Sequence, residues 1–288
     1  MSVRTVIVGT DGAPSSSATV EWAAREAGRR GASLRIVHIL EWNDEESRES
    51  AGNSYVERVW AASDSLTATA ARRAREVAPE IAIRSDTLIG HPAARILELA
   101  RDAELIVLGS RGRGGFAGLR LGSVSLRVAT HAPCPVAVVR GTPVAGAPVF
   151  AGIHGSPATD HVLETAFEAA VARAAALVVV RAFAPAKQPW APPEQDGVER
   201  DRIEEQLAPW RQKFPDVPVE IRLAHETVAA TLENASAEGQ LMIVGSHSRG
   251  VVRGALLGST GLHLLQHAAC PVLITRPLNA DPGSPQIR

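Results

Sequence analysis

The chain has 288 residues, of which 45% are apolar and 21% are charged, and its formal net charge is −1. This length favours two domains, and the near-neutral charge excludes a generally basic surface of the kind that binds nucleic acid. No apolar run is long enough to cross a bilayer, and two cysteines cannot build a disulfide framework, so we expect neither a nucleic acid nor a membrane as partner.

The first segment, MSVRTVIVGTDG, places an aspartate directly behind a short apolar run. It therefore lacks the long apolar core and the small-residue cleavage site of a secretory signal. We expect a cytoplasmic protein in which Cys134 and Cys270 are reduced, buried thiols.

Short β-rich segments alternate with longer helical ones through the first half of the chain. Predicted strands cover residues 3–10, 33–40, 80–89, 104–110 and 135–140. Predicted helices cover Pro14–Arg30, Val56–Val77 and Ala93–Asp102, and a fourth begins at Gly122. Proline at position 14 suits a first helical turn, and Ser123 can cap the fourth helix. This alternation indicates βαβ units and a mainly parallel sheet that is covered on both faces.

The second half repeats the first. The segments GSVSLRVATHAPCPVAVVR and GSTGLHLLQHAACPVLITR begin 136 residues apart, at Gly122 and Gly258, and share Gly, Ser, Leu, His, Ala, Cys, Pro, Val and Arg at matching places. Further strands are predicted at 147–153, 176–183, 217–224, 240–246 and 271–276. Solenoid repeats span roughly 20–50 residues, so this longer period indicates a duplicated domain. We expect domains at 1–142 and 147–277.

The stretch GSRGRGGFAGLRLGSVS, residues 109–125, holds six glycines and follows directly on a predicted strand. In an open parallel sheet, ligands bind beyond the carboxyl ends of the strands where the strand order reverses. The helix that follows offers unpaired N–H groups and a positive dipole end, and the glycines let backbone N–H groups approach an anion closely. The loop therefore predicts a cradle for a phosphate.

Two other glycine loops are excluded. A Walker loop needs a lysine, and the first half of the chain contains none. A dinucleotide fingerprint can be read at residues 112–117, but that motif belongs after the first strand and opens a helix, whereas this one follows the fourth strand.

These residues resemble the universal stress protein family. The specific feature is the spacing of Gly109, Gly112 and the Gly122-Ser123 pair, with two and then nine residues between them. The VGTDG segment at the first strand end, His38 and the CPVAVV strand are also similar to that family. The resemblance implies two tandem flavodoxin/Rossmann-like α/β domains, each with a five-stranded parallel sheet in the order 3-2-1-4-5 between helices, and it implies a cytoplasmic location.

The resemblance also implies binding of ATP, with Mg²⁺, in members that hold the motif. The adenosine side would meet Thr10, Asp11 and Ile39, and the phosphates would meet Gly109, Arg111, Gly112, Gly122, Ser123, Val124 and Ser125. From the residues alone, Asp11 could instead be a turn residue, and Arg111 and Arg113 could be solvated.

The second copy departs from this pattern at three positions. His154 replaces Asp11, Ser248 replaces Gly112 and Gly261 replaces Ser125. A side chain at a left-handed glycine position costs on the order of 1 kcal/mol, and a lost hydroxyl donor costs roughly 1 kcal/mol. We therefore expect the main nucleotide site in the first copy.

The leading interpretation is a non-catalytic, nucleotide-dependent stress-response protein. A slow ATPase or nucleotidyl-transfer enzyme and a nucleotide-independent interaction module remain alternatives. The last strand of each copy is expected at a sheet edge, which favours an intrachain pseudo-dimer and allows a homodimer.

Two histidines of the second copy have the spacing of a helical metal pair. His263 and His267 stand four residues apart, but the sequence places no carboxylate beside them. They are interpreted as ordinary helix-surface histidines, and no metal site is expected.

Overall fold

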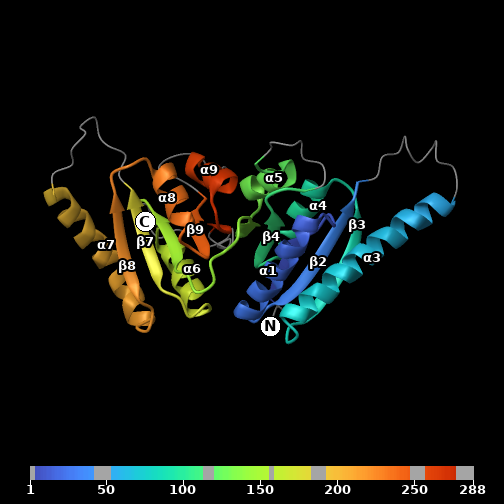
Figure 1. Cartoon of the computed structure of the whole chain (residues 1–288), viewed down its shortest axis with the longest axis horizontal. Coiled ribbons are helices and arrows are strands. Elements are labelled where there is room, and N and C mark those ends of the chain that lie inside the picture. The colour runs from blue at the N-terminus through green and yellow to red at the C-terminus, as the bar shows by residue number, and fades with distance from the viewer. Residues whose placement is uncertain are drawn as a thin grey trace, which may run out of the picture. The chain divides into compact units, whose positions relative to one another are not determined.

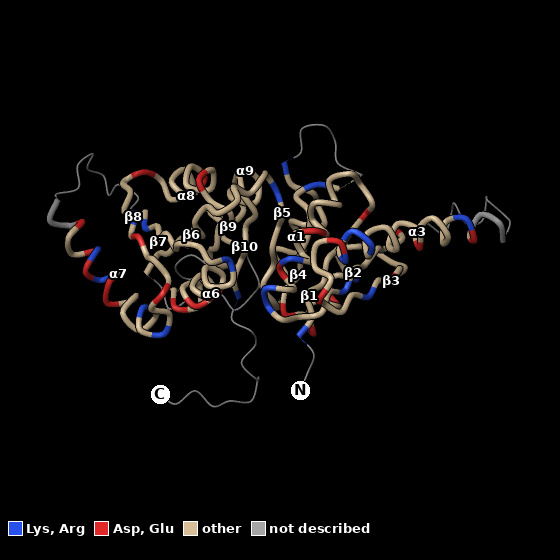
Figure 2. Tube along the Cα trace, turned by 60° about the horizontal axis from the view of Figure 1, so that its bottom comes forward, with Lys and Arg blue, Asp and Glu red and all other residues tan. Residues whose placement is uncertain are grey.

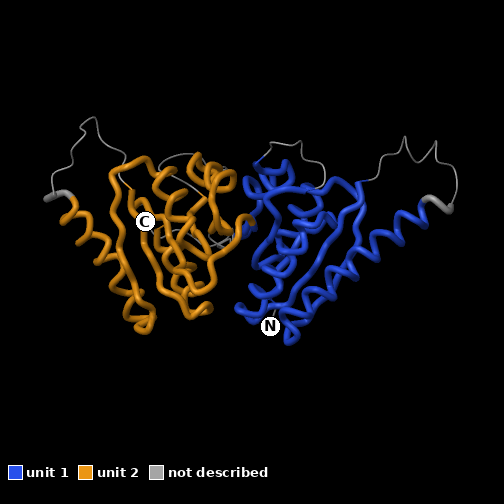
Figure 3. The backbone as a smooth tube through the Cα atoms, viewed as in Figure 1, with its two compact units in different colours: residues 1–139 blue, residues 140–288 orange. Residues whose placement is uncertain are grey.

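The computed structural model describes residues 4–41, 53–112, 120–155, 159–182, 193–246 and 257–276, with the side chains of 53–55 and 193–195 left out of the description. The chain divides into two compact units, Met1–Val139 and Arg140–Arg288 (Figure 3). Each unit is a parallel sheet with helices on both faces (Figure 1), so the predicted α/β class is confirmed.

Unit 1 has five strands in the order β3-β2-β1-β4-β5. The strands are β1 (Thr5–Gly9), β2 (Ser33–Leu40), β3 (Ile83–Ile89), β4 (Leu105–Gly109) and β5 (Val136–Val139). The helices are α1 (Pro14–Arg30), α3 (Asn53–Val77), α4 (Pro92–Leu99) and α5 (Ser123–His131). The strand order reverses between β1 and β4, which pair in parallel, as the family resemblance predicts.

Unit 2 repeats this topology in the order β8-β7-β6-β9-β10. Its strands are β6 (Val149–Ile153), β7 (Leu177–Ala182), β8 (Val219–Ala224), β9 (Leu241–Gly245) and β10 (Val272–Thr275). Its helices are α6 (Thr159–Val171), α7 (Pro193–Lys213), α8 (Val228–Ser236) and α9 (Ser259–His267).

The two faces of each sheet carry different helix pairs. In unit 1, α1 packs against α3, and α4 packs against α5 (Figure 1). In unit 2, α6 packs against α7 and α8 packs against α9. Right-handed crossovers explain this pairing. The chain moves from the first strand to the edge of the sheet at the third strand and then crosses to the other side of the first strand, so the later two helices cover the opposite face.

Helix starts agree with the sequence at α1 and differ at α5. Pro14 opens α1, where its missing N–H costs no hydrogen bond. The predicted cap Ser123 is instead the first helical residue of α5, and Ser259 has the same place in α9. Gly122 and Gly258 are the N-caps and make no side-chain hydrogen bond. This correction leaves the first N–H groups of both helices uncapped by any N-cap side chain.

The central strands are apolar throughout, as expected for a sheet covered on both faces. Residues 105–108 of β4 and 241–244 of β9 are all buried. Both cysteines are buried as predicted, and burial raises the pKa of the Cys270 thiol to about 12. That thiol is therefore protonated and unreactive at neutral pH.

Charged residues of both signs are interspersed over the described chain, and α7 carries acidic and basic side chains in alternation (Figure 2). Among the described residues, no helix combines the length and the apolar character that a membrane crossing requires.

We predict that Phe167→Ala destabilises unit 2 by about 3–5 kcal/mol, because a fully buried aromatic side chain is replaced by a cavity. The Phe167 ring is 0% exposed and stacks 5.6 Å from the ring of Phe214. Urea denaturation followed by circular dichroism measures the change. The control is Val171→Ala at the end of the same helix, where the side chain is 53% exposed; an equal loss of stability in both variants would contradict the assignment of Phe167 to the core.

Candidate functional site

The segment after β1 forms a tight turn into α1. The Asp11 carboxylate accepts a hydrogen bond through Oδ1 from the Ala13 N–H at 3.0 Å, and Gly12 has a φ of 72°. One carboxylate oxygen of Asp11 therefore belongs to the turn, as is common for an Asp-Gly pair. Its second oxygen, Oδ2, faces Gly112 across the gap between β1 and β4, and a Cβ atom on Gly112 would lie 2.7 Å from it.

The glycine-rich loop is closed at its base by hydrogen bonds. The Gly122 N–H donates to the Ser110 carbonyl at 2.8 Å. The Ser125 hydroxyl, which is 7% exposed, donates to the Gly109 carbonyl at 2.7 Å. These two hydrogen bonds bring the first turn of α5 to the end of β4. The two ends of the glycine motif therefore lie close together in space.

The start of α5 is suited to an anion. Its first turn contains no acidic residue, and its N-cap, Gly122, makes no side-chain hydrogen bond. Ser123 is exposed and Val124 is partly exposed. Because the first N–H groups of a helix lack intrahelical acceptors and lie at the positive end of the dipole, this turn can bind a negatively charged group.

Glycine is required at position 112 for a reason different from the one expected. The sequence pattern predicts a left-handed backbone conformation at Gly112. The φ angle of Gly112 lies outside the left-handed region, so this prediction is wrong. The close approach of Asp11 explains the glycine instead, since any side chain would displace the carboxylate. Gly109 is similarly confined, by Thr19 Oγ1 at 3.1 Å from the position of a Cβ atom.

The predicted residues divide between two sides of the sheet. Neighbouring residues of a strand point to opposite faces, and His38 and Leu40 line a cavity beneath α1 and α3. Ile39 therefore points to the side of α4 and α5. A Cβ atom on Gly9 would also meet Ile96 of α4, so the predicted crevice borders this side.

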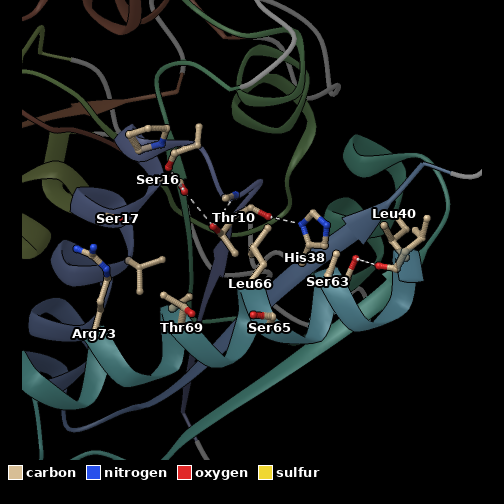
Figure 4. A pocket seen from close by; sticks show the side chains of 17 residues that line it. Thr10, Ser16, Ser17, His38, Leu40, Ser63, Ser65, Leu66, Thr69 and Arg73 are labelled. Carbon is tan, nitrogen blue, oxygen red and sulfur yellow. Dashed lines mark hydrogen bonds between the residues drawn. The ribbon is translucent and has the colours of Figure 1, made fainter. Parts of the chain in front are cut away.

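The cavity on the opposite side has a volume of about 740 Å³. The ends of β1 and β2 and the start of α1 form one wall, and α3 forms the other (Figure 4). Of the ten predicted site residues, Thr10 alone lines this cavity. The Thr10 hydroxyl donates to Ser16 Oγ at 3.1 Å, and the Thr10 carbonyl lies 2.9 Å from His38 Nδ1.

The contribution of α3 to this cavity was not expected from the sequence. Helix α3 lines it with three hydroxyl groups, one guanidinium and four apolar side chains: Ser63, Ser65, Thr69, Arg73, Val59, Ala62, Leu66 and Ala70 (Figure 4). The available signal was the run SDSLTATA inside an otherwise ordinary helix, because serine and threonine are weak helix formers that are seldom so concentrated.

Unit 2 keeps the backbone hydrogen bond at the start of the helix but not the side chains of unit 1. The Gly258 N–H donates to the Ser246 carbonyl at 3.1 Å, as Gly122 does in unit 1. Gly261 provides no hydroxyl, and a Cβ atom there would lie 2.7 Å from Leu257 Cδ1. Ser248 lies outside the described residues, as does Arg113 in unit 1.

The comparisons with known proteins agree with this architecture. The family model described as "Universal stress protein family" matches residues 2–140 and 148–276. Universal stress protein Rv2005c of Mycobacterium tuberculosis is 33% identical over 290 residues, covering 94% of this chain and 96% of that protein. A second protein of the same organism, universal stress protein Rv1996, is 32% identical over 314 residues with 97% of each chain covered.

A crystal structure supports the fold. The universal stress protein from Archaeoglobus fulgidus superposes with a TM-score of 0.72 at 17% identity, over 94% of this chain and 98% of that one. The two family matches, the relatives of matching length and the repeated topology agree, and the chain belongs to the universal stress protein family as a member with two tandem domains.

Proposed function

We propose that this chain is an ATP-binding, non-catalytic universal stress protein of the cytoplasm, with its main nucleotide site in unit 1. The observation that carries the proposal is the start of α5. There, uncapped N–H groups lie beside a loop that is closed onto the end of β4.

The electrostatics of this place suit a polyphosphate. The helix dipole, the backbone N–H groups and the absence of an acidic residue in the first turn of α5 together favour negative charge. Arg111 and Arg120 are exposed at the two ends of the loop. They supply positive charge without the lysine that a Walker loop would use.

Gly122 supports a ligand at this position. Its φ of −72° and ψ of 150° are accessible to any residue, and a Cβ atom would come no closer than 3.7 Å to a described atom of the protein. The described part of the chain therefore does not itself require glycine here. Close approach of phosphate oxygens to the backbone explains the missing side chain.

The sugar and base would extend along the carboxyl ends of β1 and β2. Asp11 Oδ2 faces this crevice, and carboxylates bind ribose hydroxyls well. Ile39 offers an apolar contact for the adenine ring, and Mg²⁺ would neutralise the phosphates. Asp11 Oδ1 already accepts the Ala13 N–H, which supports binding in preference to hydrolysis by this carboxylate.

Unit 2 is proposed to bind nucleotide weakly. It lacks the carboxylate of Asp11, since His154 stands there. Because position 261 is glycine, it also lacks the Ser125 hydroxyl that ties the start of α5 to the end of β4. The two domains therefore have unequal affinities. Occupancy of unit 1 would change the surface offered to a partner.

Gly122→Val is predicted to lower the affinity for ATP by tenfold or more, a change of about 1.4 kcal/mol or more. The valine methyls would occupy the space of the phosphate, while the backbone keeps a conformation that valine adopts readily. Isothermal titration calorimetry of the purified chain measures the affinity and the stoichiometry.

The matched control is Gly258→Val, the same change at the equivalent position of unit 2. It should leave the tight site unchanged, with one tight site per chain. Two equally tight ATP sites, or equal losses in both variants, would contradict the assignment to unit 1. Undiminished affinity in Gly112→Glu, whose carboxylate would face Asp11, would contradict the crevice itself.

A second variant separates the crevice from the cavity under α1 and α3. Thr69→Leu adds volume to the cavity wall without touching the loop, and leucine is a good helix former. We predict ATP affinity within about twofold of the parent chain, which is within roughly 0.5 kcal/mol. A tenfold loss would instead place the nucleotide in the cavity.

Assembly is proposed from the sheet edges. Within the unit 1 topology β5 is an outer strand, and the same is true of β10 in unit 2. Because short apolar edge strands invite pairing, we propose an intrachain pseudo-dimer through these strands and a homodimer of the whole chain. Sedimentation velocity tests the homodimer: a species of 30.4 kDa at all concentrations would contradict it.

A further inference from the structure

Three side chains with metal-binding atoms converge between α8 and α9 of unit 2. His263 Nε2 lies 2.6 Å from Glu233 Oε2, and His267 Nδ1 lies 3.9 Å from Glu233 Oε1. One ligand atom from each side chain lies within 4.8 Å of the others. Over the described ranges of the chain, this is the one group of three or more His, Cys, Asp or Glu residues with such spacing.

The cluster contains a carboxylate that the sequence did not place beside the two histidines. The sequence gives no sign of this carboxylate, because Glu233 lies 30 residues before His263. The packing of α8 against α9 supplies it (Figure 1).

The two helices hold the three side chains in place through their buried faces. Leu264 and Leu265 are fully buried and fix the orientation of α9, while Leu232, which is 2% exposed, does the same for α8. Ser236 Oγ accepts a hydrogen bond from the Ala269 N–H at 2.8 Å, which ties the end of α9 to the end of α8. The geometry of the cluster thus rests on packing and does not depend on a bound ion.

The two imidazole rings lie side by side next to the carboxylate. The rings of His263 and His267 are stacked with centroids 4.4 Å apart and an angle of 6° between their planes. Imidazole nitrogens are common ligands of transition metals. The stacking therefore places two such ligands beside Glu233.

We propose that Glu233, His263 and His267 form a binding site for a divalent transition-metal ion of the zinc type. With bonds of 2.0–2.1 Å, the ligand atoms of a tetrahedral zinc lie about 3.3 Å apart. One ligand atom from each of the three side chains lies within 4.8 Å of the other two, so small side-chain rotations would bring them to this separation. Two imidazoles and one carboxylate suit zinc and its neighbours in the series, and they do not suit Ca²⁺ or Mg²⁺, which require more oxygen ligands.

The site is open on one side. The side chains of Glu233, His263 and His267 are 37%, 33% and 27% exposed. Three protein ligands leave the fourth position of a tetrahedron to water or to an exchangeable ligand. An ion there would connect α8 to α9. The first turn of α9 corresponds to the first turn of α5, where unit 1 is proposed to bind the nucleotide.

Unit 1 provides an internal comparison. The positions that correspond to Glu233, His263 and His267 hold Leu97, Arg127 and His131. One leucine and one arginine remove two of the three ligands. The same fold with the same helix pair is therefore predicted to bind no metal there, so the proposed site is specific to unit 2.

The test is a competition titration of the intact chain with Zn²⁺ against a chromophoric chelator. Loss of an outer-shell partner alone lowers metal affinity about 10–100-fold. We therefore expect Glu233→Gln and His263→Gln each to lower Zn²⁺ affinity at least tenfold. His131→Gln, the matched change at the end of α5, should leave it unchanged.

Replacement of Zn²⁺ by Co²⁺ reports on direct coordination. The parent chain should show visible ligand-field absorption typical of a four-coordinate site, and His267→Gln should lose it while its circular dichroism stays the same. Zn²⁺ affinity that is equal in the parent, Glu233→Gln and His263→Gln would overturn the proposal. An equal loss in His131→Gln would overturn it as well. Because the site lies outside the crevice of unit 1, failure here leaves the nucleotide proposal untouched.

Discussion

The parallel pairing of β1 with β4 is the constraint on which the candidate nucleotide site depends. Parallel strands end at the same edge of the sheet, and the order reverses between these two, so no helix crosses over the gap that they share. The segments that leave β1 and β4 therefore meet above it. Asp11 and Gly112 face each other there only because of this pairing.

The same constraint explains why the loop motif contains glycines at fixed distances. Gly109 and Gly112 are confined by Thr19 and Asp11, which belong to the opposite segment. Gly122 has room for a side chain among the described atoms but lies at the start of α5. One spacing motif thus combines two requirements of different kinds: close packing of the protein against itself at the first two glycines, and open backbone at the third.

Much of the fold could be read from the sequence because the relevant signals are local. Alternation of apolar strands with amphipathic helices gives βαβ units, and Pro14 marks the start of α1. The details that could not be predicted depend on distant contacts. The reason for glycine at position 112 lies in a carboxylate 101 residues earlier. The three hydroxyl groups of α3 come to line a cavity only because that helix packs over β1 and β2. Glu233 likewise reaches His263 through helix packing and not through spacing.

Because the domain is duplicated, the two units can carry different side chains at equivalent positions. The backbone hydrogen bond that ties the start of α5 to the end of β4 recurs between α9 and β9, because backbone geometry tolerates many side chains. The chemistry around it does not recur. Unit 1 retains Asp11 and Ser125 beside the turn, whereas unit 2 has lost both and carries a glutamate and two histidines on the adjacent helix pair. Buried leucines hold α8 and α9 in position. Polar residues on the outer surfaces of these helices can therefore change without loss of core packing. Unit 2 can in this way carry metal-binding side chains that unit 1 lacks.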